Sequence, residues 1–404
     1  MKENIGTKQI VEIIIVAIFI FATAIVSIFA GYMYAGINGE TAEECELEYS
    51  ASVQEFIKEY NRILDNYYLD VDEDILIKGA IRGMLEALED EHTSLLDESD
   101  YYRFQQRVQG FYEGIGIGLY DDDDDQIVVS TVFENTPAER AGVHVRDILI
   151  EIDDIDLGDK DSQFLVEHIR DSEGDSVELT VLRAGDKITF EIEKETVILP
   201  SVHSQIIDEG PIKIGYLNVS VFALNTYGQF QNHLEKVMDL GVEGLIIDLR
   251  YNTGGYLSTA EKLLSVFLDK DKVIYKTDEN GVVQSFYAKG DETTTYPIVI
   301  LGNKHSASAS EIMIAAMQEA YNAPFVGETT YGKGTVQEIV DLSDGDSLKY
   351  TARKWLTPDG NWIDDIGIKP DYEVEQDLDF YLSFDPKDDR QLQKAIEVFI
   401  DLIQ

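Results

Sequence analysis

Residues 297–311 read PIVILGNKHSASASE, an apolar run that ends in a polar turn of small residues. The chain then continues as an apolar helical stretch, so the turn joins a strand to a helix. Strand-like runs at Leu245–Asp248 and Ile298–Leu301 alternate with helical stretches at Tyr227–Leu240, Thr259–Phe267 and Ser308–Ala320. This alternation predicts an α/β domain from Ile212 onward, with function at the ends of its strands.

The turn in this stretch suits a nucleophilic serine. Small residues around Ser308 leave its hydroxyl uncovered. The N-terminus of a helix also offers free backbone N–H groups and about half a unit of positive charge to a developing oxyanion. Serine and alanine are nevertheless common near helix N-caps, so the turn alone is a weak signal and a structural role explains it better.

A lysine between two glycines follows in the segment GETTYGKGTVQ, residues 327–337. The segment matches the start of a phosphate-binding loop, but Gly334 replaces the Ser or Thr that would hold magnesium, and a strand-like segment follows. We therefore expect no nucleotide and no cofactor. Lys333 would be a base only if burial lowered its pKa from about 10.4, which the apolar neighbours Val336 and Ile339 allow.

A third polar turn, DLRYNTGGYL at residues 248–257, ends another apolar strand. Two adjacent glycines in it let a substrate or another loop approach the backbone closely. Without a functional partner, the same turn is simply a connection between a strand and a helix.

Together, these segments resemble the C-terminal processing (tail-specific) peptidases of the S41 family of serine proteases. The SASASE box, the YGKGTVQ box 25 residues further on and the upstream Arg-x-Asn-x-Gly-Gly motif occur in the order of that family. The segments WLTP (355–358), GNWI (360–363) and GIKPD (367–371) resemble its closing motifs. The resemblance covers nearly the whole chain outside the N-terminal apolar segment.

The resemblance implies a crotonase/ClpP-like α/β protease core with a Ser/Lys site. It assigns the nucleophile to Ser308, the general base to Lys333 and an orienting role to Gln337. It also implies an oxyanion hole formed by the backbone N–H of Ala309 and of either Gly254 or Gly255. His305 raises a Ser/His alternative, although a side chain three positions before Ser308 does not readily reach its hydroxyl.

Residues 110–197 have a different sequence pattern, in which short runs of β-branched residues are separated by turn residues. Strands are expected at Ile115–Leu119, Ile127–Val132, Ile148–Ile152, Val177–Leu182 and Ile188–Ile192, with brief helices at Thr136–Ala141 and Ser162–Arg170. This module resembles the PDZ domain of the same enzymes. The resemblance implies that a substrate C-terminus binds at Gly114, Ile115, Gly116, Ile117 and Gly118 by strand addition.

Acidic residues dominate the charge, with 78 Asp and Glu against 32 Lys and Arg, a net charge of −46. Such a surface repels phosphate backbones, so nucleic acid is not an expected partner. A solvated, aggregation-resistant surface is the simplest reading, and steering of cationic substrates is the alternative. The run Asp121–Asp125 lacks the spacing of a calcium loop and is expected to be an exposed hairpin turn, so no metal is assigned.

The segment Ile13–Met33 contains 21 residues without a charge, enough to cross a hydrocarbon core of about 30 Å. Lys2 and Lys8 precede it and acidic residues follow it, which predicts a cytoplasmic N-terminus and an extracytoplasmic remainder in the cell membrane. Ala22-Thr23-Ala24 leaves a cleaved signal peptide as the alternative. Cys45 is the only cysteine, so no intramolecular disulfide forms.

The predicted fold is therefore multidomain α/β. We expect a stub and transmembrane helix (1–35), a helical N-terminal region (36–109), an inserted PDZ-like domain (110–197), the protease core (198–375) and a C-terminal helical segment (376–404). In the second region, apolar residues from Val53 to Tyr67 recur at helical spacing, and Asp72 is a candidate N-cap of the next helix.

The expected function is that of a serine endopeptidase that cleaves extracytoplasmic proteins and recognises their C-terminal tails through the PDZ domain. Its expected partners are peptides or proteins that have a free, apolar C-terminus. It is also expected to contact the membrane, and the family resemblance suggests that it forms a homodimer. The alternative is a non-catalytic PDZ-containing binding protein on the same fold. A crotonase-like enzyme acting on thioesters would explain neither the export signal nor the PDZ module.

Overall fold

The computed structural model describes residues 49–404 except 173, 292–295, 343–344, 378–379 and 381–385. The predicted membrane segment Ile13–Met33 and Cys45 lie outside the described residues. Within the described part, no helix has both the length and the apolar character needed to cross a bilayer. The described residues divide into two compact units, one that ends at Gly79 and one that begins at Ala80.

The first unit contains helix α2, Ala51–Asn66, where the sequence predicts an amphipathic helix. Ser50 caps it, because its Oγ accepts a hydrogen bond from Val53 N at 3.4 Å. Helix α2 has no buried residue, and its apolar side chains Phe56, Ile57 and Ile63 are 40–50% exposed. Helix α3, Glu73–Glu86, begins at the predicted cap Asp72, whose Oδ1 accepts from Asp74 N at 3.0 Å.

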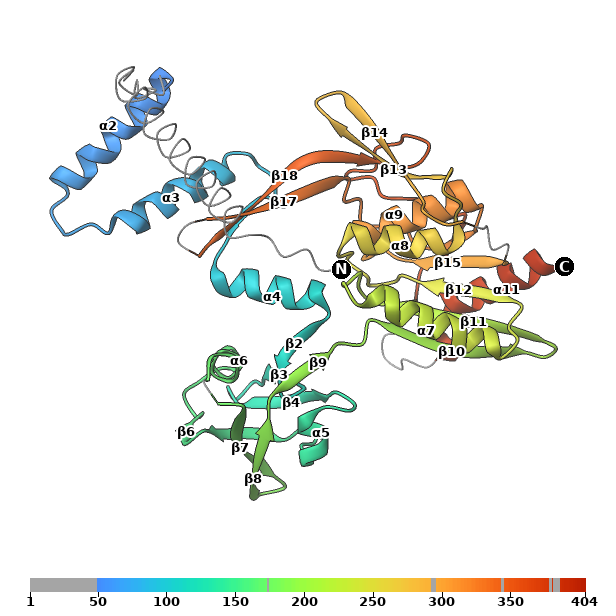
Figure 1. The fold of residues 1–404 in the computed structure, drawn as a ribbon, viewed down its shortest axis with the longest axis horizontal. Coiled ribbons are helices and arrows are strands. Elements are labelled where there is room, and N and C mark those ends of the chain that lie inside the picture. Colours follow the sequence, from blue (N-terminus) through green and yellow to red (C-terminus); the bar gives the residue numbers. More distant parts are fainter. Residues whose placement is uncertain (1–48, 173, 292–295, 343–344, 378–379, 381–385) are drawn as a thin grey trace, which may run out of the picture. The chain divides into compact units, whose positions relative to one another are not determined.

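The β-rich module contains an antiparallel sheet in the order β3-β4-β5-β7-β8, with β6 paired to β5 (Figure 1). The strands are β3 Ile117–Asp121, β4 Ile127–Val132, β5 Ile148–Ile152, β6 Ile155–Asp156, β7 Ser176–Arg183 and β8 Asp186–Glu193. Helices α5, Pro137–Ala141, and α6, Ser162–Asp171, complete the module. Its buried side chains include Val129, Ile152, Leu165 and Leu179, which form a core separate from that of the protease region.

Most predicted elements of this module are confirmed. The predicted strand at Ile115–Leu119 instead begins at Ile117, because Gly116 adopts a φ of +90° and turns the chain. The aspartate run forms the expected turn between β3 and β4, in which Asp122 Oδ1 accepts from Asp124 N and Gln126 N. Strands β2 Phe111–Gly114 and β9 Glu195–Ile198 pair with each other where the module joins the rest of the chain.

The α/β core is built on a six-stranded sheet in the order β10-β11-β12-β15-β16-β19. Strand β10, Val202–Glu209, is antiparallel to β11, Ile212–Val219. The other strands run parallel to β11 and are β12 Gly244–Asp248, β15 Ile298–Gly302, β16 Phe325–Gly327 and β19 Tyr372–Glu373. The predicted alternation of strands and helices in this region is therefore confirmed.

Helices cover both faces of this sheet (Figure 1). On one face Leu245, Ile247, Ile298 and Ile300 pack with side chains of α7 Thr226–Asp239, α8 Leu257–Phe267 and α9 Ala309–Ala316. On the other face Ile246, Val299 and Leu301 pack against α11, Arg390–Ile403. Successive side chains of a strand alternate between faces, so two buried faces require the continuous apolar runs seen in the sequence.

Arg250 fastens helix α11 to the end of β12. Its guanidinium donates to both oxygens of Asp389, at 2.8 and 2.9 Å, and to Asp248 Oδ2 at 2.7 Å. Asp389 is also the N-cap of α11, since its Oδ1 accepts from Leu392 N at 2.9 Å. The arginine of the Arg-x-Asn-x-Gly-Gly motif thus holds the C-terminal helix on the sheet edge where the motif lies.

A second sheet borders the core, in the order β1-β18-β13-β14 with β17 paired to β18. Its strands are β1 Ser94–Leu96, β13 Val273–Glu279, β14 Val282–Tyr287, β17 Thr335–Asp341 and β18 Ser347–Leu356. Strand β1 belongs to the region for which the sequence predicts helices. It is followed by α4, Glu98–Gln109.

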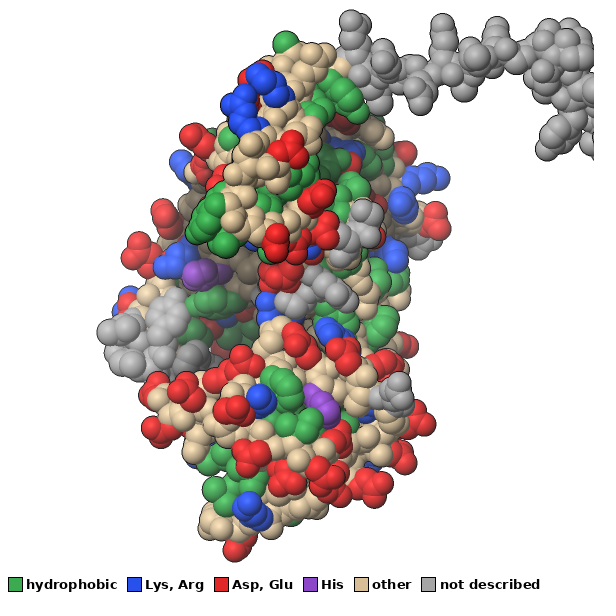
Figure 2. Space-filling view, turned by 90° about the vertical axis from the view of Figure 1, so that its left-hand side faces the viewer, with side chains coloured by type: hydrophobic (Ala, Val, Ile, Leu, Met, Phe, Trp, Pro, Cys, Tyr) green, Lys and Arg blue, Asp and Glu red, His purple; other side chains and the backbone are tan. Residues whose placement is uncertain are grey.

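Acidic side chains are spread over the face shown in Figure 2 and do not form one continuous patch there. This distribution agrees with the solvated surface expected from the net charge of −46. On this face the charge does not by itself mark a binding site.

Candidate active site

The three turns singled out in the sequence meet at one edge of the parallel sheet. They follow β12, β15 and β16, which are neighbours in the sheet and point in the same direction. The carboxyl ends of parallel strands share one edge, which is the usual place for a site in such a fold. A cavity of about 460 Å³ opens there, and its lining includes Gly254, Gly255, Ser308, Lys333 and Gln337.

The three serines of the SASASE box have different roles. Ser306 is fully buried, and its Oγ donates to Leu249 O at 2.8 Å. Ser310 is also fully buried, and its Oγ donates to Asn252 O at 2.7 Å. Both outer hydroxyls therefore fasten the box to the neighbouring turn. Ser308 is the serine of the box that lines the cavity.

Ser308 has an unusual backbone, with φ +56° and ψ −116° at the N-cap of α9. A non-glycine residue in this conformation is strained, and such strain is common where a nucleophile must project from a strand–helix turn. Gly254 makes room for it, because a Cβ on Gly254 would lie 2.9 Å from Ser308 Cβ and 2.9 Å from Ala307 O. Gly254 also has a φ of +103°.

The two glycines that are candidates for the oxyanion hole, Gly254 and Gly255, differ in their hydrogen bonding. The Gly254 N–H donates to Asn252 Oδ1 at 2.9 Å and is therefore engaged. Asn252 is itself fully buried and donates from Nδ2 to Val219 O at 2.8 Å, so its side chain has a fixed orientation. The backbone N–H groups of Gly255 and of Ala309, the first residue of α9, belong to residues that line the cavity with Ser308 and are the remaining candidates for facing an oxyanion.

Glu311 joins the serine turn to the lysine turn. Its carboxylate accepts from Ser308 N at 2.8 Å, Lys333 N at 2.9 Å and Gly332 N at 2.7 Å, and from Thr330 Oγ1 at 2.6 Å. The side chain is fully buried. Burial raises the pKa of Glu311, although these hydrogen bonds oppose the rise.

Two tryptophans of the closing motifs hold the lysine turn from the other side. Trp355 Nε1 donates to Lys333 O at 2.6 Å, and Trp362 Nε1 donates to Gly334 O at 3.1 Å. Gly334 N in turn donates to Asp364 Oδ1 at 2.8 Å. A Cβ on Gly334 would lie 2.6 Å from Asp364 N, so this tight packing requires a glycine.

The environment of Lys333 favours its neutral form. Burial lowers the pKa of Lys333, and the nearby ammonium of Lys349 lowers it further. The carboxylates of Asp90, Glu311 and Glu91 act in the opposite direction without reversing the shift. This direction is the one that a lysine needs in order to act as a base near neutral pH.

Gln337 lies on β17, and its Nε2 donates to the hydroxyls of Thr335 at 3.0 Å and Thr351 at 3.2 Å. It shares the cavity with Ser308 and Lys333. Among the described residues, no hydrogen bond links the Lys333 amine to Ser308 or to Gln337. Catalytic hydrogen bonds are often long before substrate binds, so proximity within one cavity is the relevant observation.

Sequence reasoning missed several residues around this cavity. Glu311 stands three positions after Ser308, the spacing of a capping box, which was the available signal. Lys349 of β18 lines the cavity without any motif to mark it. Helix α4 adds four residues at helical spacing, Tyr101, Phe104, Gln105 and Val108.

His305 does not lie in the cavity lining. Its ring stacks on that of Tyr251, with the centroids 5.1 Å apart and the planes 18° from parallel. This contact gives the histidine a packing role at the surface, which agrees with the expectation that it does not reach the Ser308 hydroxyl.

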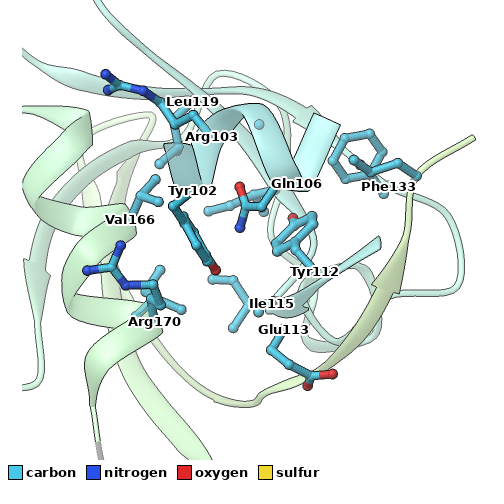
Figure 3. Close-up of a pocket in the computed structure, with 15 residues that line it drawn as sticks. Tyr102, Arg103, Gln106, Tyr112, Glu113, Ile115, Leu119, Phe133, Val166 and Arg170 are labelled. Carbon is cyan, nitrogen blue, oxygen red and sulfur yellow. The ribbon is translucent and has the colours of Figure 1, made fainter. Parts of the chain in front are cut away.

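The β-rich module has a groove of about 380 Å³ between β3 and α6 (Figure 3). Gly114, Ile115, Ile117 and Gly118 line it, whereas Gly116 is absent from the lining and packs against Thr136. Val166 and Ile169 of α6 form the opposite wall. Tyr112 also lines the groove, and burial raises the pKa of its hydroxyl to about 12.

Helix α4 lines this groove as well, through Tyr102, Arg103 and Gln106. Figure 3 shows the Tyr102 ring between α4 and Arg170 of α6, whose guanidinium carbon lies 4.8 Å from the ring centroid. Arg103 also donates to Gln163 of α6. One side of α4 thus belongs to the groove, and another side belongs to the cavity with Ser308.

Comparison with known proteins identifies three segments. The peptidase family S41 model matches residues 213–374, the PDZ domain model matches residues 114–193, and a model of the activating protease CtpB N-terminal domain matches residues 27–100. The first two matches coincide with the α/β core and with the β-rich module.

Curated relatives extend the match over most of the chain. The carboxy-terminal processing protease CtpB of Bacillus subtilis (strain 168) is 34% identical over 360 residues, 85% of this chain and 74% of that protein. The carboxy-terminal processing protease CtpA of the same organism is 35% identical over 320 residues, 79% of this chain and 68% of that protein. A probable CtpA-like serine protease of Staphylococcus aureus (strain MSSA476) is 32% identical over 379 residues, 93% of this chain and 74% of that protein.

The fold, the cavity and these matches agree on one family. With a PDZ domain inserted before an S41 core, this chain is a serine peptidase of the S41 family and belongs to its carboxy-terminal processing proteases.

Proposed function

We propose that this S41 peptidase cleaves peptide bonds with Ser308 as nucleophile and Lys333 as general base. The observation that supports this most directly is the shared acceptor Glu311, which binds the backbone N–H of Ser308 at 2.8 Å and of Lys333 at 2.9 Å. A single rigid group thus holds both turns beside one cavity. The lowered pKa of Lys333 supports its role as a base.

The reaction starts when neutral Lys333 removes the proton of Ser308 as the hydroxyl attacks a peptide carbonyl. The N–H groups of Gly255 and Ala309 stabilise the oxyanion that develops on that carbonyl. Lys333 then gives the proton to the leaving amine and later activates water against the acyl-enzyme. Gln337 orients the amine of Lys333 during these steps.

We further propose that the groove between β3 and α6 binds the C-terminal tail of the substrate. Ile115, Ile117, Val166 and Ile169 supply apolar walls, which suit an apolar tail. Strand addition to β3 would satisfy the backbone of that tail. The Gly114–Gly118 segment would receive its terminal carboxylate through backbone N–H groups.

The chain is proposed to sit in the cell membrane through residues 13–33, with the PDZ and protease regions outside the cytoplasm. The uncharged run of 21 residues and the lysines before it support this placement.

We also propose a homodimer formed through α2, because Phe56, Ile57 and Ile63 expose an apolar face there.

The catalytic assignment predicts a complete loss of cleavage in Ser308→Ala and Lys333→Ala. The substrate is an unfolded protein with a free apolar tail, and product formation is followed with time. A loss of about 10⁴-fold or more in kcat is expected for either variant, because each removes a member of the acyl-transfer site. His305→Ala is the matched control and should keep wild-type activity.

Equal cleavage by wild type and Ser308→Ala would refute this assignment. If neither protein cleaves but both bind the tail peptide equally, the chain acts as a PDZ-containing binding protein instead.

The pH dependence follows from the lowered pKa of Lys333. The neutral amine is the active form, so kcat/KM should rise with pH and level off above the pKa of Lys333. The midpoint is expected below the usual lysine value of about 10.4, because burial and Lys349 disfavour the ammonium. The measurement is kcat/KM between about pH 6 and 9; a flat profile with chemistry rate-limiting would contradict this base.

Membrane attachment predicts that the full chain sediments with membranes and that a chain lacking residues 1–35 does not. A protease added outside intact cells should degrade the PDZ and core regions. Recovery of the full chain in the soluble fraction, or complete protection of both regions, would reject the proposed placement.

The dimer predicts that Phe56→Glu combined with Ile57→Glu yields monomers, because two charges would have to be buried in the interface. Sedimentation velocity measures the result, with Asn61→Glu on the same helix as the control that stays dimeric. A monomeric wild type, or a dimer that survives both charges, would eliminate α2 as the interface.

A further inference from the structure

The amide of Gln337 has a donor end and an acceptor end, and only one orientation serves a lysine. Its Nε2 donates to Thr335 Oγ1 at 3.0 Å and to Thr351 Oγ1 at 3.2 Å. This leaves the acceptor Oε1 for the cavity that Gln337 lines together with Lys333. An amide turned over would present N–H groups to the lysine amine, which a proton-accepting base does not need.

Thr351 connects this amide to a carboxylate from a distant part of the chain. The Asp90 carboxylate accepts hydrogen bonds from the Thr93 hydroxyl and, at 2.9 Å, from the His92 N–H. The Thr93 hydroxyl donates to Asp90 Oδ2 at 2.6 Å and accepts from Thr351 N at 3.0 Å. Thr93 is buried.

The hydrogen-bond capacities of these groups give the chain of contacts a direction. An ionised carboxylate only accepts, so the Thr93 hydroxyl donates to Asp90 and its oxygen accepts from Thr351 N. A side-chain amide nitrogen only donates, so the hydroxyl oxygen of Thr351 accepts the hydrogen bond from Gln337 Nε2. The Nε2 end of Gln337 is therefore the end that faces Thr351. Burial opposes the ionised form of Asp90, but the hydrogen bonds that Asp90 accepts lower its pKa.

We call the set of contacts from Asp90 through Thr93 and Thr351 to Gln337 the relay. Strand pairing holds its two ends, Asp90 and Gln337, in register. Strand β1 is antiparallel to β18 with Ser94 opposite Lys349, which places the residues just before β1 beside Thr351. Strand β17 pairs with β18 so that Gln337 lies opposite Thr351. Asp90 and Thr93 thus come from the segment before the PDZ domain and reach the protease core from the far side of β18.

We propose that Asp90, Thr93 and Thr351 are positioning residues that set the orientation of the Gln337 amide toward Lys333. This inference rests on the proposed catalytic role of Lys333. According to this proposal, Lys333 is correctly oriented only when the segment before β1 is packed against β18.

Thr351→Val tests the relay, because it keeps the side-chain shape and removes only the hydroxyl. We expect kcat to fall by about 10- to 100-fold with little change in KM, since a misplaced catalytic group slows chemistry rather than binding. Thr351→Ser restores the hydroxyl and should recover most of kcat. Thr277→Val, a buried threonine of β13 in the same sheet, is the matched control and should stay at the wild-type level.

A double-mutant cycle separates positioning from general damage. If the relay acts only through Gln337, then adding Thr351→Val to Gln337→Ala should cost no further activity. Additive losses, or a Thr351→Val variant with wild-type kcat, would overturn the proposal. Asp90→Asn provides a second route if Thr351→Val folds poorly, and it should lower kcat in the same way and show the same lack of additivity with Gln337→Ala.

The same experiments distinguish this proposal from the catalytic assignment. An active Ser308→Ala variant rejects the assignment and the relay together. An inactive Ser308→Ala variant beside a fully active Thr351→Val variant rejects only the relay.

Discussion

One buried carboxylate connects the parts of the active site. Glu311 accepts four hydrogen bonds from the serine turn and the lysine turn, including the backbone N–H of Ser308 and of Lys333. The donors on Thr330 and Gly332 would otherwise be buried without a partner, which costs about 1–3 kcal/mol per group. The relative position of Ser308 and Lys333, the proposed nucleophile and base, therefore depends on this single side chain more than on any direct contact between them.

The parallel sheet places the turns that Glu311 connects next to each other. Strands β12, β15 and β16 deliver three turns to one edge, and Arg250 clamps α11 to that edge through Asp389. The outer serines of the SASASE box tie their turn to Leu249 and Asn252. The strained Ser308 backbone is thus supported by buried hydrogen bonds on both sides, the condition under which such strain persists.

Helix α4 lines both the groove of the PDZ domain and the cavity that contains Ser308. Tyr102, Arg103 and Gln106 line the PDZ groove, whereas Tyr101, Phe104, Gln105 and Val108 line the cavity with Ser308. A helix has 3.6 residues per turn, so these two sets occupy different sides of the same short element. The segment before α4 adds β1 to the sheet that borders the core, so residues 90–109 contribute to this sheet, the cavity and the groove at once.

The sequence by itself determined the α/β core and most strands of the PDZ domain, and the family resemblance of its motifs singled out Ser308 and Lys333 as candidate catalytic residues. These features follow from local periodicity and from motif spacing, which short segments carry in full. Tertiary structure alone decided that Gly254 donates to Asn252, that Glu311 bridges two turns, and that Thr351 contacts both Gln337 and Thr93. Strand β1 has only three residues, too few to show a period, and its partner lies more than 250 positions away. Contacts of that kind arise from packing and from the need to satisfy buried polar groups, and no local pattern in the chain records them.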